Sequence, residues 1–203
     1  MNGASLTNIW HTVRDSAFST LWAALGVGAV LCIVGALWLR RRRAARSVAA
    51  IMGRLGLDRV HDVMIPDGLG GQIQLDYLVL TPRGLVVVDV RDYRGTIFAG
   101  ETIDRWTQIV GRRSFHFENP LFLNRARMMG VKSLAGDVPV YELVAFTRDG
   151  QFPKGMPPQV CYVDQLGASA PFATAAGLPG EPPLPVRLAW QTIRQAAVRS
   201  LPG

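Results

Sequence analysis

Two aspartates stand inside otherwise apolar segments of this sequence. Asp76 interrupts QIQLDYLVL, and Asp89 interrupts LVVVDVR. A carboxylate within an apolar strand is costly to bury unless it has a partner. Arg91 follows Asp89 by two residues, so both side chains project from the same face of a strand. If Asp76 lies beside them, two carboxylates and a cation meet at one sheet edge, which suits a divalent metal and a phosphate.

The same three residues also have a purely structural interpretation. In that interpretation Asp89 and Arg91 form an ion pair that supports the fold, and Asp76 faces water. Structural ion pairs perturb carboxylates just as active sites do. Residue chemistry alone favours the structural interpretation.

The segments that carry the two aspartates are predicted to form an antiparallel β-hairpin. Residues 73–81 and 85–91 are strongly apolar, and Pro82-Arg83-Gly84 lies between them. In such a turn Pro fixes φ and Gly supplies conformational freedom. The hairpin is the element that would bring Asp76 next to Asp89.

The rest of the body is predicted to contain more strands and two helices. Asn119-Pro120 opens a helix over residues 121–134, because Pro suits the first helical position. A loop rich in Pro, Gly and Ala precedes a last helix at residues 186–201. The other predicted strands are residues 60–65, 95–99, 105–110, 114–117, 138–147 and 160–163. This order indicates an α/β (α+β) fold with a mixed β-sheet flanked by helices.

Four arginines are candidates for contacts with the phosphates of a substrate. They are Arg112, Arg113, Arg125 and Arg127, and aromatic side chains lie near them in the sequence. Together they could line a groove that binds nucleic acid. The alternative, a solvated face above core aromatics, is the interpretation that the pattern favours.

The N-terminal region contains a predicted membrane-spanning helix at residues 19–39. No charged residue occurs from residue 16 to residue 39, and the core reads LWAALGVGAVLCIVGALWL. At 1.5 Å per residue this core covers about 28 Å, close to the thickness of a bilayer interior. A cleaved signal peptide would have its basic residues before the apolar core, whereas here they follow it.

The arginines after the apolar core predict the direction of the anchor. Arg40, Arg41, Arg42 and Arg43 follow the core directly, and positive charge stays in the cytoplasm. We therefore expect a single-pass protein of the cell (inner) membrane, with its N-terminus outside and its body in the cytoplasm. The four arginines should contact anionic lipid headgroups.

Charge and cysteine content limit the function classes. Residues 1–46 hold six arginines and one acidic residue, whereas residues 47–203 hold sixteen Lys and Arg against fourteen acids. The net charge of +7 therefore describes the membrane junction and is weak support for nucleic-acid binding. The two cysteines, Cys32 and Cys161, have no evident partner, so a disulfide scaffold is not expected.

One long stretch of the body resembles a known family. The segment QIQLDYLVLTPRGLVVVDVRDYRGTIFAG, followed by DRWTQIVG and FENPLFLN, is similar to the nuclease-related domain, NERD, of the PD-(D/E)XK nuclease superfamily. The resemblance implies a restriction-endonuclease-like core. It also implies catalytic roles for Asp76, Asp89 and Arg91, with Asp76 and Asp89 binding Mg²⁺.

The match to the family pattern is incomplete at the polar positions. Asp76 matches the family aspartate, but Asp89 stands where the family has Glu and Arg91 where it has the catalytic Lys. Leu123 stands at the position of a family Gln, and the helix before the strands has no acid. Arg keeps the charge of Lys but differs in geometry and cannot exchange a proton in the same way.

Two functions follow from the match and its departures. The first is a membrane-anchored, metal-dependent nuclease that acts on DNA or RNA phosphodiesters. The second is a catalytically degenerate module that binds nucleic acid or a protein partner at the cytoplasmic face of the membrane. The expected organisation begins with an outer N-terminus at residues 1–18, a transmembrane helix at 19–39 and a juxtamembrane basic helix at 40–56. A NERD-like domain at 57–165 follows, and a Pro/Gly-rich loop with the C-terminal helix occupies 166–203.

Overall fold

The computed structural model of the chain describes residues 31–36, 48–173 and 181–199. The chain divides into two compact units, Met1–Ser47 and Val48–Gly203. In the first unit, residues 31–36 are helical. The rest of the predicted span and Arg40–Arg43 lie outside the described residues. Within the described ranges no helix is both long and apolar enough to cross a membrane, so the span stays a prediction.

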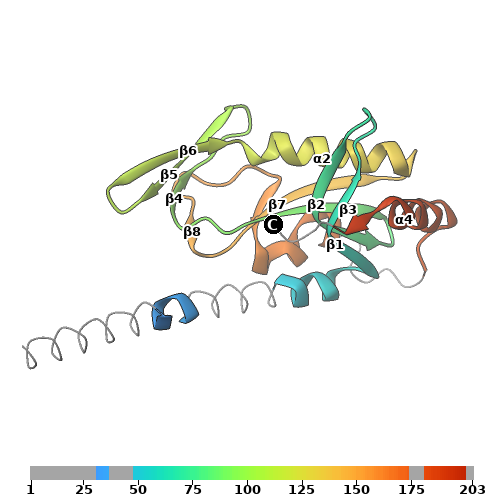
Figure 1. The fold of residues 1–203 in the computed structure, drawn as a ribbon, viewed down its shortest axis with the longest axis horizontal. Helices are drawn as coiled ribbons and strands as arrows, with labels where there is room; N and C mark the ends of the chain where they lie inside the picture. Colours follow the sequence, from blue (N-terminus) through green and yellow to red (C-terminus); the bar gives the residue numbers. More distant parts are fainter. Residues whose placement is uncertain (1–30, 37–47, 174–180, 200–203) are drawn as a thin grey trace, which may run out of the picture. The chain divides into compact units, whose positions relative to one another are not determined.

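The second unit contains a six-stranded mixed sheet (Figure 1). The order across it is β10-β1-β2-β3-β7-β9. The strands from β10 to β3 pair antiparallel, whereas β7 pairs parallel to β3 and β9 parallel to β7. Their bounds are β1 Asp58–Pro66, β2 Gln72–Thr81, β3 Gly84–Arg91, β7 Val140–Phe146, β9 Val160–Tyr162 and β10 Val198–Arg199.

Helices cover both faces of this sheet because its central strands are apolar on both sides. Leu78 of β2 packs with helices α2 (Pro120–Ala135) and α4 (Leu184–Ala196), and its neighbour Val79 packs on the opposite face. That face is covered by the helix at residues 48–55, by η1 (Val163–Ala168) and by α3 (Ala170–Ala173). The period of two along each strand therefore assigns each side chain to one layer of helices.

A second sheet of four strands corrects the prediction of a single mixed sheet. Its order is β6-β5-β4-β8, with β4 and β8 parallel and the other pairs antiparallel. Strands β4, β5 and β6 follow β3 in the chain but do not pair with it, because β2 and β7 occupy both edges of β3. The bounds are β4 Gly95–Phe98, β5 Arg105–Val110, β6 Arg113–Glu118 and β8 Gly150–Gln151.

The predicted last helix is right in type but wrong at its end. Helix α4 stops at Ala196, and Ala197 has an extended backbone. The next two residues form β10, which pairs with Val63 and Met64 of β1. The prediction of a helix to residue 201 was wrong because residues 198 and 199 pair with the open edge of β1. This pairing is a tertiary feature that the local sequence pattern does not contain.

Asn119 fixes the start of α2 and thereby the position of the helix that carries the candidate site. Its side-chain oxygen accepts the N–H of Leu121 at 3.0 Å, which is an N-cap. Its amide nitrogen donates to the carbonyls of Gly100, Glu101 and Ile103 at 3.2, 3.2 and 2.9 Å. One buried side chain thus joins the helix start to the loop between β4 and β5.

We expect Asn119→Ala to lower the free energy of unfolding by about 3 kcal/mol, measured by urea denaturation. The loss combines the N-cap with buried carbonyl groups that no longer have a donor. Asn119→Ser keeps an N-cap oxygen and should recover about 1 kcal/mol of that loss. An Asn119→Ala variant as stable as the wild type would contradict this role.

Candidate functional site

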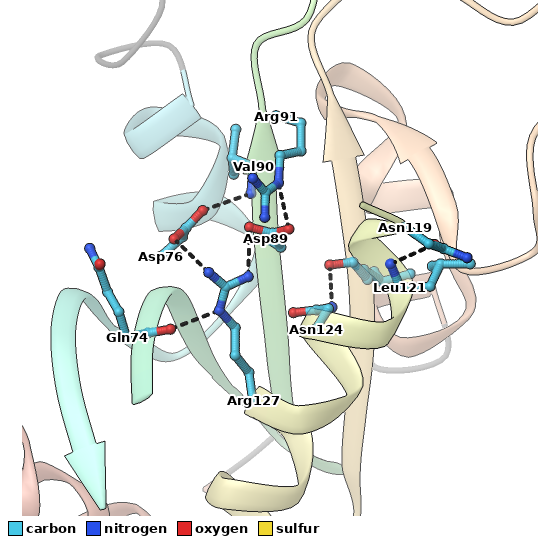
Figure 2. A network of polar contacts seen from close by, with 10 residues as sticks. Gln74, Asp76, Asp89, Val90, Arg91, Asn119, Leu121, Asn124 and Arg127 are labelled. Atoms are coloured by element: carbon cyan, nitrogen blue, oxygen red, sulfur yellow. Dashed lines mark hydrogen bonds and ion pairs between the residues drawn. The ribbon is translucent and has the colours of Figure 1, made fainter. Parts of the chain in front are cut away.

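Asp76 lies where the pairing between β2 and β3 ends. The ladder runs as far as Tyr77 opposite Val88. One residue beyond it, the carboxylate of Asp76 accepts the backbone N–H of Val90 at 3.1 Å (Figure 2). At the end of the ladder, the side chain of Asp76 therefore accepts the hydrogen bond that a backbone carbonyl would otherwise accept. This side chain is 27% exposed.

Asp89 points from β3 toward helix α2 and has no solvent exposure. Leu85 and Val87, which alternate with it on the same face, pack in the core beneath α2. The side chain of Asp89 is 0% exposed, and Nε of Arg91 donates to its Oδ2 at 2.7 Å. The structural ion pair between Asp89 and Arg91, one of the two sequence interpretations, is present.

Arg127 of α2 enters the space between the two carboxylates. Its Nη1 lies 3.0 Å from Oδ1 of Asp89, and its Nη2 lies 3.8 Å from Oδ1 of Asp76. Its Nε donates to the backbone carbonyl of Gln74 at 2.8 Å. Figure 2 shows the guanidinium reaching from the helix to both strands. The prediction had grouped Arg127 with surface arginines, but its side chain is only 10% exposed.

The other three arginines of the predicted phosphate groove do not join this network. Arg125 is exposed on α2 and lies 3.5 Å from Glu142 of β7. Arg112 and Arg113 are exposed at the turn between β5 and β6, where Gly111 has φ +61°. This hairpin belongs to the second sheet and extends away from β1 and α4 (Figure 1). The sequence-predicted arginines therefore occupy three separate places.

Two motif residues of α2 have structural contacts. Asn119 is the N-cap described above, and Asn124 donates from its amide nitrogen to the carbonyl of Leu143 in β7 at 3.0 Å. The side-chain oxygen of Asn124 is buried without a hydrogen-bond partner. Leu123, at the position of the family Gln, is exposed. These asparagines hold α2 against the sheet, so that Arg127 can reach the carboxylates.

The charges of the network shift each other's protonation. Burial raises the pKa of Asp89 to about 6, and the hydrogen bond and negative charge of Asp76 act in the same direction. Arg91 and Arg127 oppose this shift. Burial disfavours the charge of Arg91, but its ion pair and hydrogen bond with Asp89 outweigh burial and raise the pKa of the guanidinium.

The arrangement does not fit a Mg²⁺ ion. Mg²⁺ needs several oxygen ligands in near-octahedral geometry. In the described part of the chain, no group of three or more Asp, Glu, His or Cys side chains could hold a metal. Only Asp76 and Asp89 converge, and the guanidinium of Arg127 lies between them. The position that a cation would take between the carboxylates is filled by a positive side chain of the protein.

The network includes one residue, Arg127, that was not predicted to belong to it. Arg127 lies on the same helix stripe as Leu121, Asn124 and Val131, all of which are buried. An arginine on the core side of an amphipathic helix requires a buried partner. That spacing is the signal that could have placed Arg127 against the two aspartates.

The chain is similar in sequence to a known protein family. Residues 40–147 match the profile of the NERD, nuclease-related domain, family. A protein of Bacillus anthracis described as uncharacterized is 30% identical over 88 residues, which are 43% of this chain and 42% of that relative. The chain thus spans less than half the length of this curated relative. No solved structure matches the chain.

We expect the carboxyl group of Asp89 to titrate with a midpoint near pH 6, because it is buried beside Asp76. The native state then binds this proton more tightly than the unfolded chain. Its contribution to stability is full below the ordinary pKa of 3.8 and is lost as the pH rises through about 6. Carbon-13 NMR of labelled aspartate carboxyl groups measures the midpoint.

Asp67 serves as the internal control for this titration. The N–H groups of Leu69 and Gly71 donate to its carboxylate at 2.7 and 2.9 Å and lower its pKa. The two aspartates should therefore shift in opposite directions in one experiment. A midpoint for Asp89 at or below that of Asp67 would contradict the burial argument.

Proposed function

This chain belongs to the NERD, or nuclease-related domain, family, and we propose that its domain binds nucleic acid without the metal-dependent cleavage of a nuclease. The family match supports a nuclease-related role. The observation that carries the proposal is the guanidinium of Arg127 between Asp76 and Asp89. We also propose a restriction-endonuclease-like core, which the mixed sheet with helices on both faces supports.

The hairpin of β5 and β6 supplies the surface that we propose binds the nucleic acid. Arg112 and Arg113 are exposed at its turn, and Phe115, two residues along β6 from Arg113, is 47% exposed. Residues 113 and 115 share one face of the strand. Arginines contact phosphates, and an exposed aromatic ring offers a stacking surface for an unpaired base. This combination favours a single strand as the ligand.

We expect the full-length chain, purified in a mild detergent, to bind a labelled single-stranded oligonucleotide in the presence of EDTA. Fluorescence anisotropy across a salt series measures the affinity and its salt dependence. Replacing Arg112 and Arg113 together by Ala should reduce the slope of log K against log salt by about 1.4, since each phosphate contact contributes about 0.7. Phe115→Ala should weaken binding with little change in that slope.

Arg187→Ala is a matched control for the arginine variant. Arg187 is also exposed, but it lies on α4 and pairs with Glu181 at 2.8 Å. Its loss should leave binding unchanged. Absence of any affinity in the wild type would instead favour a protein partner as the ligand of this module. Mg²⁺-dependent cleavage that Asp76→Asn abolishes would favour the alternative, a metal-dependent nuclease.

We further propose that residues 19–39 anchor the domain to the cell membrane, with Arg40–Arg43 at anionic headgroups on the cytoplasmic side. The uncharged apolar run and the arginines that follow it support this proposal. Its consequence is that the nuclease-like domain works close to the inner membrane face.

We expect the full chain to remain in the membrane fraction after carbonate washing of bacterial cells that express it. A reporter enzyme fused to the C-terminus should be active if it is one that works in the cytoplasm, and inactive if it is one that works only outside. Replacing Arg40–Arg43 with Gln should weaken this orientation, because it removes the positive charge that holds the flank inside. Release of the wild-type chain by carbonate would contradict the anchor.

A further inference from the structure

We propose that the guanidinium of Arg127 is a built-in substitute for a divalent cation, and that removing it leaves a site that binds one. The proposal rests on the contacts of one side chain with three oxygen atoms. It is independent of whether the domain binds nucleic acid.

The three oxygens face a single positive group. Oδ1 of Asp89 lies 3.0 Å from Nη1 of Arg127, and Oδ1 of Asp76 lies 3.8 Å from Nη2. The carbonyl oxygen of Gln74 accepts from Nε at 2.8 Å. Figure 2 shows them around one side of the guanidinium, with β2 supplying two and β3 one. Two carboxylates and a backbone carbonyl are hard oxygen ligands of the kind that Mn²⁺ and Mg²⁺ accept.

The contact to Asp89 has the character of an ion pair. Oδ1 of Asp89 and Nη1 of Arg127 are both buried, and neither makes a hydrogen bond of acceptable geometry despite their separation of 3.0 Å. The guanidinium thus compensates the negative charge of this oxygen without donating a hydrogen bond to it. Oδ1 of Asp89 therefore has no hydrogen-bond donor that a cation would need to displace once Arg127 is absent.

Charge balance points to a cationic occupant, and the hard oxygen ligands favour a divalent ion. Asp76 and Asp89 carry two negative charges when both are ionised, and Arg91 compensates one of them through Oδ2 of Asp89. Without Arg127, the negative charge of Asp76 would lie uncompensated beside the carboxylate of Asp89, whose side chain is 0% exposed. A hard cation bound to the freed oxygens restores the missing positive charge.

A further buried oxygen lies on the same stripe of helix α2 as Arg127. Oδ1 of Asn124, one turn before Arg127 on the buried stripe of α2, has no hydrogen-bond partner. Its amide nitrogen is held by Leu143 in β7, so the orientation of the side chain is fixed.

The competing explanation is that Arg127 only ties α2 to β2 and β3. On that explanation its removal lowers stability and creates no affinity for metal. The two explanations differ in one measurable quantity, the binding of a divalent cation by variants that lack the guanidinium.

The experiment titrates Mn²⁺ alone into the full-length chain and follows free Mn²⁺ by electron paramagnetic resonance. We expect no specific binding by the wild type, and binding by Arg127→Ala with a dissociation constant on the order of 0.1–1 mM, as in weak protein calcium sites. Arg127→Ala combined with Asp76→Asn should lose this binding. Arg125→Ala is the matched control, because Arg125 is exposed on the same helix and contacts only Glu142.

Folding gives a second readout. Arg127→Lys retains a positive charge and should fold without binding Mn²⁺. If Arg127→Ala unfolds in EDTA, Mn²⁺ should restore the folded state, since a ligand that binds only the native state stabilises it. Wild-type binding as tight as that of the variant would overturn the proposal. The proposal would also be overturned if Arg127→Ala folds but does not bind Mn²⁺. It would equally be overturned if the variant is unfolded and Mn²⁺ does not restore the folded state.

Discussion

The negative charge of Asp89 has to be compensated inside the protein, because its side chain reaches no solvent. Strand β3 lies between β2 and β7, and positive charge reaches Asp89 from its own strand and from the helix layer above. The chain uses both routes, with Arg91 at one carboxylate oxygen and Arg127 at the other. Burying an ion without such partners costs several kcal/mol. The positions of β3 and α2 are therefore linked by charge as well as by apolar packing.

The rest of the domain holds that link in place. Asn119 sets where α2 begins, and Asn124 fixes the helix to β7. On the apolar side, Val131 of α2 packs in the same core as Leu78 and Val87. The helix thus has polar attachments at its start and apolar ones toward its end. Because the sheet is apolar on both faces, a second helix layer covers the side away from Asp89.

Much of this arrangement could be predicted from local sequence patterns. The period of two and the Pro-Arg-Gly turn placed Asp76 and Asp89 on adjacent strands, and the pair of Asp89 with Arg91 followed from their spacing. Arg127 was not assigned to the pair, because its partners are distant in the sequence and only the packing of α2 brings them together. The second sheet and β10 were missed for a related reason. Which edge a strand joins depends on which edges are already occupied, and the pattern of the strand itself does not carry that information.

The guanidinium of Arg127 also bears on whether folding of the domain depends on the concentration of metal ions. When two carboxylates are held together by a metal ion, the binding free energy of the ion is part of the folding free energy, and the fold responds to the supply of that ion. A cation attached through the backbone of α2 cannot diffuse away and is present once for every copy of the chain. If Arg127 stands in for a cation as proposed, the population of the folded domain does not depend on the concentration of free divalent ions.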